Sequence, residues 1–356
     1  NATGTEVTAL VDAFNGALQG VVPASGGGTV NFLRADGSWA APAGGSPGGA
    51  PGEIQWNSGG AFAGAADVEI EGGQLRLPVI ALPAAPASGG VKLFGRDVGG
   101  RLLPAIMGPS GLDTALQPFF GRNRISLWVP YGSGTTVFGF GSAATATGTA
   151  TGTTASASGN LHARIRRIEY LVTTASTSGV AGWREQASFL TVGGDAAQKG
   201  GFHMVLRWAP ATGVSNASHR AFAGMRGSTG APTDVDPSTL TNIVGMGYDA
   251  ADTNVQFMYN DASGTATRID LGAAFPKPSA DRTAVYEIAL FSPPGTSQSV
   301  SYAVTDLVSG AVASGTVTTD LPSTTQMLAP RCHTSVGGVS ALTGVAIFGF
   351  YQETDI

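Results

Sequence analysis

The sequence predicts a mainly β protein, in which a helix and a glycine-rich, short-stranded segment precede an antiparallel β-sandwich. Of 356 residues, 53 are Gly and 20 are Pro, about a fifth of the chain, where average usage gives about 12%. Hydrophobic residues reach 42% while charged residues stay at 12%. From about residue 120 onward, apolar and polar residues alternate in short runs, which is the period of half-buried strands.

The composition also excludes several classes of protein. A chain with 42% hydrophobic residues and a net charge of -5 does not match disorder through charge repulsion. The glycines follow no three-residue period, so a collagen helix is excluded. The few basic residues do not make a nucleic-acid surface. No run of about 18 apolar residues predicts a membrane helix.

Residues 1–20 carry the helical pattern of the chain. Thr3 and Glu6 have the spacing of a capping box. One apolar stripe follows at three- and four-residue steps, which places its members on a single helix face; they include Val7, Leu10, Phe14 and Leu18. A lone helix cannot bury this stripe. We expect it to associate in parallel with copies of itself, or to dock on another protein.

Residues 21–117 are predicted to form a Gly/Pro-rich shaft or collar. Its extended pieces are too short to bury enough surface to offset their ordering entropy, roughly 1–2 kcal/mol per residue. Interdigitation with two other chains would solve this, which favours a trimer. The pieces are Thr29–Arg34, Glu53–Trp56, Asp67–Ile70 and Gln74–Val79.

Residues 118–356 are predicted to form the β-sandwich head, most simply a lectin-like jelly roll. Phe202, Met204, Leu206 and Trp208 alternate with polar or smaller residues. The tract 142–159, nearly all Ala, Thr, Gly and Ser, is expected to be a long loop or a flexible wall of this domain. Further strands are expected at Ile125–Val129, Thr136–Phe140, Leu161–Val172, Ala221–Met225, Ile243–Tyr248, Val255–Tyr259, Arg268–Leu271, Tyr286–Leu290, Val300–Val304, Gly315–Thr318 and Ala346–Phe350.

Four segments resemble fibre or receptor-binding proteins of tailed bacteriophages. FLRADGSWAAP (32–42) resembles a recurring fibre element, and GEIQWNSGGAFAGAADVEI (52–70) is similar to a shaft segment in which Tyr is common where Trp56 stands. Residues 87–130 and 245–276 resemble the shaft-to-head junction and part of the head. The resemblance implies a homotrimer on the virion surface, made in the host cytoplasm and attached to other virion proteins through its N-terminal region.

Four aromatic residues are candidates for packing between the chains of this trimer. Trp39 follows a predicted tight turn, where it meets its copies at the axis or closes the turn as a lid. Trp56 belongs to the shaft, and Phe119 and Phe120 are expected to bury against neighbouring chains at the neck.

The sequence offers little for catalysis. The acidic pairs Asp234 with Asp236, and Asp249 with Asp252, lie in turn-like contexts, where Asp commonly forms turns. No GxSxG motif is present. Cys332 is the one cysteine and is expected to be a buried, inert thiol. We therefore expect no enzyme.

No cofactor is expected either, with calcium as the alternative. Asp249, Asp252, Asn254, Asn260 and Asp261 could supply oxygen ligands. Their spacing matches no EF-hand loop, so turn chemistry is favoured.

Adhesion is the function that remains. Sugar-binding surfaces combine aromatic faces with polar groups. The candidates are Trp183 with Arg184, His219 with Arg220, and Tyr248, Tyr259 and Asn260. For Trp183 the alternative is a core or intersubunit anchor, and the tyrosines alternatively close the sandwich.

The sequence therefore predicts a trimeric fibre or spike subunit whose head binds a host-surface glycan, non-covalently and multivalently. One alternative is a structural virion component, such as a head fibre, collar or connector. Another is an enzyme that degrades capsule.

Overall fold

The computed structural model describes residues 32–35, 38–40, 48–84, 86, 90–107, 113–115, 124–128, 145–153, 160–197, 199–211, 216–278 and 284–354. The chain divides into two compact units, Asn1–Pro78 and Val79–Ile356. The predicted helix at 1–20 and the neck residues Phe119 and Phe120 lie outside the described residues. Within the described part, no helix is long and apolar enough to span a membrane.

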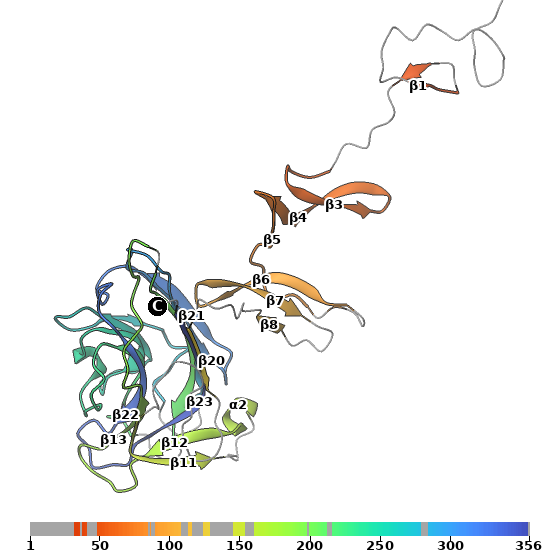
Figure 1. Cartoon of the computed structure of the whole chain (residues 1–356). Coiled ribbons are helices and arrows are strands. Elements are labelled where there is room, and N and C mark those ends of the chain that lie inside the picture. Colours follow the sequence, from red (N-terminus) through yellow and green to blue (C-terminus); the bar gives the residue numbers. More distant parts are fainter. Residues whose placement is uncertain are drawn as a thin grey trace, which may run out of the picture. The chain divides into compact units, whose positions relative to one another are not determined.

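The first unit contains two small antiparallel sheets (Figure 1). β1 (Phe32–Leu33) pairs with β2 (Trp39–Ala40), and Trp39 is half-buried. β3 (Glu53–Ser58), β4 (Ala61–Glu71) and β5 (Gln74–Arg76) form a three-stranded ribbon. These strands cover the predicted extended pieces between 53 and 76. Trp56 is 53% exposed.

The second unit opens with the ribbon of β6 (Lys92–Val98), β7 (Arg101–Met107) and β8 (Asp113–Ala115). Gly99 and Gly100 form the β6–β7 turn with positive φ angles of 61° and 87°. A Cβ added to Gly100 would lie 2.1 Å from Cβ of Ser301. The turn therefore depends on glycine for its backbone conformation and for its close approach to the sandwich.

The sandwich has one sheet of seven strands and one of eight, with all strand pairs antiparallel. The seven-stranded sheet has the order β10 (Thr145–Thr147), β13 (Val180–Arg184), β22 (Ala329–Ser335), β15 (Arg220–Arg226), β16 (Ile243–Tyr248), β17 (Gln256–Asn260) and β18 (Thr267–Asp270). The eight-stranded sheet has the order β11 (Thr149–Thr153), β12 (Arg167–Leu171), β23 (Gly344–Thr354), β14 (Phe202–Pro210), β19 (Tyr286–Ser292), β20 (Val300–Asp306) and β21 (Val312–Val317), with β9 (Arg124–Trp128) beside β23.

The chain winds back and forth between the two sheets, as a jelly roll does. β12 lies against β13, β14 against β15, and β22 against β23. Each of these pairs is consecutive in sequence, yet its two strands belong to different sheets. The predicted antiparallel sandwich is confirmed.

Alternating side chains of both sheets fill the space between them. Met204, Leu206 and Trp208 of β14 have no exposed surface. The indole N–H of Trp208 points at the sulfur of Met246 in the opposite sheet, at 3.4 Å. Cys332 is buried, as predicted, and burial raises the pKa of its thiol well above the usual value.

The sequence-based predictions missed two strands of the seven-stranded sheet, β13 and β22, and were wrong in two further places. The tract 142–159 contains β10 and β11, which pair with β13 and β12; Thr is β-branched and suits a strand even without apolar alternation. The strand expected at 161–172 begins with a short helix, α2 (Leu161–Arg164), and only β12 is extended.

Candidate functional site

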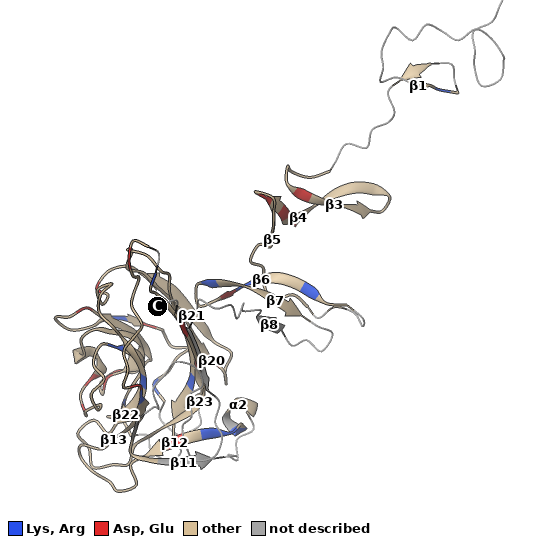
Figure 2. Ribbon diagram, in the orientation of Figure 1, with Lys and Arg blue, Asp and Glu red and all other residues tan. Residues whose placement is uncertain are grey.

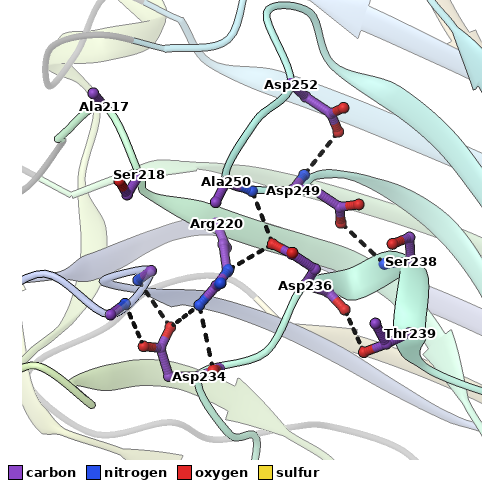
Figure 3. A network of polar contacts seen from close by, with 12 residues as sticks. Ala217, Ser218, Arg220, Asp234, Asp236, Ser238, Thr239, Asp249, Ala250 and Asp252 are labelled. Atoms are coloured by element: carbon purple, nitrogen blue, oxygen red, sulfur yellow. Dashed lines mark hydrogen bonds and ion pairs between the residues drawn. The ribbon is translucent and has the colours of Figure 1, made fainter.

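The candidate site is a network of charged residues at the end of the sandwich where β15 begins and β16 ends (Figure 3). The segment that joins β15 to β16, residues 227–242, crosses the outer surface of the seven-stranded sheet. Leu240 holds this segment in place by packing on Phe222, Ile243 and Met258. As a result, the TDVDP motif lies beside the first residue of β15.

Arg220 is the centre of the network. Its Nε donates to Oδ1 of Asp236 at 2.6 Å and its Nη1 donates to Oδ1 of Asp234 at 2.8 Å. The side chains of Arg220 and Asp234 are 16% and 8% exposed, whereas that of Asp236 is 36% exposed. Burial alone would lower the pKa of Arg220, but its hydrogen bonds and ion pairs with the two aspartates raise it.

Asp234 also holds the loop that follows β22. Its two carboxylate oxygens accept the backbone N–H groups of Gly337 and Gly338, each at 2.8 Å. Burial works to raise the pKa of Asp234, yet hydrogen bonds from Ser335, the two glycines and Arg220 lower it overall. Asp234 therefore stays ionised.

A second guanidinium bridges the other acidic pair. Nη1 of Arg268 donates to Asp249 and to Asp252, at 3.1 Å in each case. The N–H of Ala250 donates to Oδ1 of Asp236 at 2.9 Å. Asp236 thereby connects the two halves of the network.

Behind the network lie His219, Tyr248 and Lys277. His219 contacts the Tyr248 hydroxyl at 3.0 Å and the Thr343 hydroxyl at 3.2 Å. Burial, together with the charge of Lys277, lowers the pKa of His219 to about 4. Nζ of Lys277 donates to the carbonyl oxygens of Ala217, Asp249 and Ala250 and lies 5.4 Å from the centre of the Tyr248 ring.

This arrangement suits non-covalent recognition better than glycoside hydrolysis. Hydrolysis by two carboxyl groups needs one of them to be a proton donor with a raised pKa. The pKa of Asp234 is lowered instead, and each acidic pair shares one guanidinium. The network fixes carboxylate and guanidinium groups in place, with Asp236 and Arg268 the more exposed at 36% and 41%.

The calcium ligands considered from the sequence are not brought together. Asp249 and Asp252 precede β17, whereas Asp261 follows it, at the other end of the strand. Asn260 donates to the carbonyl oxygen of Leu240. Among the described residues, no group of three or more His, Cys, Asp or Glu side chains is arranged to hold a metal ion.

Most of the residues nominated for sugar contact are buried. His219, Tyr248 and Asn260 have no exposed surface, and Trp183 and Tyr259 are 4% and 7% exposed. A buried ring cannot stack on a sugar from solvent. Trp183 packs edge-on against Phe350, with ring centroids 5.0 Å apart. This is the position of a core residue, the alternative to sugar contact for Trp183. Of the nominated residues, Arg184 and Arg220 keep partial exposure.

The sequence did not mark the partners that complete the network. No sequence motif connects Arg268 or Lys277 to the acidic pairs. The sequence suggests Arg220 for sugar contact, but it does not predict the ion pairs of Arg220 with Asp234 and Asp236. The contacts of Arg220 depend on where residues 227–242 cross the sheet, and those of Arg268 on the pairing of β18 with β17, which places it beside Asp249 and Asp252.

A separate cluster of polar side chains joins the β6–β7 ribbon to the sandwich. Arg101 makes a two-point ion pair with Glu353, in which Nη2 donates to Oε1 at 3.1 Å and Nη1 donates to Oε2. Glu353 also accepts the Tyr351 hydroxyl at 2.7 Å. Burial, and then the charge of Arg101, lowers the pKa of the neighbouring His203 to about 4.

Comparison with known proteins gives structural similarity alone. No protein-family model and no curated protein matches the sequence. Among solved structures, the chain is similar to peanut lectin (13% identity, TM-score 0.37, 60% of this chain and 98% of that one). It is also similar to lectin II from Ulex europaeus (10% identity, TM-score 0.40, 60% of this chain and 93% of that one). A third similar structure is a carbohydrate esterase from the Shiga toxin-encoding bacteriophage phi24B (15% identity, TM-score 0.34, 60% of this chain and 90% of that one). At these identities and scores the similarity assigns no function.

Proposed function

We propose that this chain is the subunit of a homotrimeric bacteriophage fibre or spike whose sandwich binds a glycan of the bacterial surface. The observation that carries the proposal is the distribution of exposed apolar side chains. On the β3–β5 ribbon, Trp56, Phe62 and Leu75 are 53%, 64% and 52% exposed. The sandwich, by contrast, packs most of its large apolar side chains into a continuous core.

A ribbon with no second layer is marginally stable in water, and exposed apolar patches mark interfaces. The same feature recurs on the second ribbon, where Leu93 and Leu102 are 50% and 64% exposed. The resemblance of residues 52–70 to fibre shafts supports copies of the chain as the partners. The N-terminal region would then attach the trimer to other virion proteins.

The charged network supports recognition at the head. Carboxylate and guanidinium groups already held in place lose little entropy on binding, and both hydrogen-bond well to sugar hydroxyls. Three weak sites on one rigid trimer gain roughly 10²–10⁴ in avidity over a single site.

The oligomer is tested by light scattering of the full chain. We expect a mass three times the 35.7 kDa of one chain, and a lower mass for the double variant Trp56→Ser/Phe62→Ser. Val312→Ser is the matched control, because Val312 is 63% exposed but lies in the sandwich. A wild-type mass near that of one chain would overturn the trimer.

The binding role is tested with labelled full-length protein on host cells, before and after enzymatic removal of surface polysaccharide. We expect saturable binding that disappears with the glycan and weakens in Arg220→Gln. Arg207→Gln is the control, because Arg207 pairs with Glu287 on the other sheet. Failure to bind cells that the intact particle adsorbs to would favour a structural virion component, and clearing of capsule would favour the enzyme.

A further inference from the structure

Three arginines gather on the outer surface of the seven-stranded sheet, at the opposite end of β15 from Arg220. They come from neighbouring strands: Arg184 from β13, Arg331 from β22 and Arg226 from β15. Arg331 lies directly across from Arg184 on one side and from Gly224 on the other. Arg226 is two residues beyond Gly224 and therefore faces the same side of the sheet.

This arrangement is costly in free energy. Like charges on directly opposed residues of neighbouring strands destabilise a sheet, and a buried charge needs a partner. Arg331 is 1% exposed. Burial, and then the charges of Arg226 and Arg184, lowers its pKa to about 9.

The hydrogen-bonding capacity of the cluster is only partly used. Nη2 of Arg331 donates to the carbonyl oxygens of Ser228 and Gly230, and Nε of Arg184 donates to that of Thr229 at 3.0 Å. Nε and Nη1 of Arg331 and Nε of Arg226 are buried and have no hydrogen-bond partner in the described part of the chain.

No carboxylate of the described residues lies within 4.0 Å of these three guanidinium groups. The sequence also has no Asp or Glu between Asp113 and Glu169, a span that includes the adjacent strand β10. In Figure 2, few of the described residues of the chain are coloured as charged. Arg220, on the same strand, pairs with two aspartates, so β15 carries one neutralised arginine and one, Arg226, for which the described residues supply no counter-ion.

A buried histidine lies beside the three arginines on the same face of the sheet. His333 lies two residues after Arg331 on the same face, and its Nδ1 is buried with no hydrogen-bond partner among the described residues. Burial, together with the nearby arginines, lowers its pKa to about 3, so the ring is neutral. Gly182 faces His333, and a Cβ there would lie 2.5 Å from Cβ of His333.

We propose that Arg184, Arg226 and Arg331 form a binding site for an oxyanion, and that this oxyanion is a sulfate, phosphate or carboxylate substituent of the glycan. Arg184 and Arg226 keep part of their surface in solvent and receive the anion, while Arg331 lies behind them. Guanidinium groups bind such oxyanions through paired N–H donors. The site stands on the contacts above; only the glycan as its source rests on the proposed function.

The site is tested by thermal unfolding of the full chain in sodium sulfate and in sodium chloride at equal ionic strength. A ligand that binds only the folded state raises the Tm with its concentration. We expect sulfate to raise the Tm of the wild type above its value in chloride, and Arg226→Gln and Arg184→Gln to lose most of that difference. Arg207→Gln, at an exposed arginine of the other sheet, should keep it. An equal difference in wild type and Arg226→Gln, or none in the wild type, would overturn the site.

The source of the anion is tested with dextran sulfate and uncharged dextran. We expect the wild type to bind dextran sulfate, Arg226→Gln to lose at least tenfold in affinity, and neither protein to bind dextran. A sulfate-dependent Tm without binding of dextran sulfate would overturn the glycan as source. The proposed function fails if light scattering shows a monomer or if the protein does not bind host cells. Neither result would change the effect of sulfate on the Tm, so the two failures are distinguishable.

Discussion

The ring of Phe257 stacks on that of Tyr302, with centroids 3.8 Å apart and planes inclined by 13°. Phe257 belongs to β17 and Tyr302 to β20, so the two rings come from opposite sheets. Phe257 has no exposed surface and Tyr302 is 5% exposed. The stack therefore joins the two layers of the sandwich where both sheets approach their last strands.

Replacement of Phe257 by Ala should destabilise the sandwich strongly. It removes a buried aromatic ring and leaves a cavity between the sheets, which typically costs about 3–5 kcal/mol. Unfolding in guanidinium chloride, followed by fluorescence, measures the change. Val312→Ala, at an exposed position of β21, should stay within about 0.5 kcal/mol of the wild type. Similar losses in both variants would contradict this account of the core.

Acid should unfold the sandwich between pH 6.5 and 4. Burial lowers the pKa values of His203 and His219 to about 4 and that of His333 to about 3. The unfolded chain takes up these protons near pH 6.5, whereas the folded chain does not. Stability is therefore intact above pH 6.5 and falls with pH below it, by up to about 1.4 kcal/mol per pH unit for each histidine.

The histidine contribution is measured as the slope of unfolding free energy against pH. His333→Gln should reduce that slope between pH 6 and 4 by the amount that corresponds to uptake of about one proton on unfolding. His162→Gln is the control, because His162 lies partly exposed on α2. An unchanged slope in His333→Gln would show that this histidine is protonated in the folded chain.

Arg331→Met should raise the Tm of the protein in low-salt buffer without sulfate. The change removes a buried charge that lies opposite Arg184 and has no counter-ion among the described residues. Replacing buried charges by apolar groups is often neutral or stabilising by about 1–4 kcal/mol. The carbonyl groups of Ser228 and Gly230 that it frees belong to exposed residues, where water can solvate them. A large fall in Tm would mean that Arg331 already has a compensating partner.

Arg101 and Glu353 should be energetically coupled. Glu353 is 2% exposed and Arg101 19% exposed, so Arg101→Ala leaves a buried carboxylate without its cation, a loss of about 3 kcal/mol. In a double-mutant cycle with Glu353→Gln, measured by chemical unfolding, we expect a coupling of about 1–3 kcal/mol. Additive single effects would show that the β6–β7 ribbon is held by other contacts.

The sequence by itself determined the fold class and many of the strands. The alternation along 202–208 predicts β14, and the pattern at 243–248 predicts β16, because the two-residue period of a strand is a local property. The low content of charge and the high content of Gly and Pro likewise predicted a mainly β chain. These signals require no knowledge of distant partners.

The tertiary structure decided what each polar or aromatic residue does. Trp183 is a core residue because β13 pairs with β22, about 150 residues further along the chain. Arg220 has two aspartates because residues 227–242 cross the sheet, whereas Arg331 has no acidic partner among the residues that the structure describes. Burial and charge pairing depend on contacts between segments that are distant in sequence, and the fold alone brings those segments together.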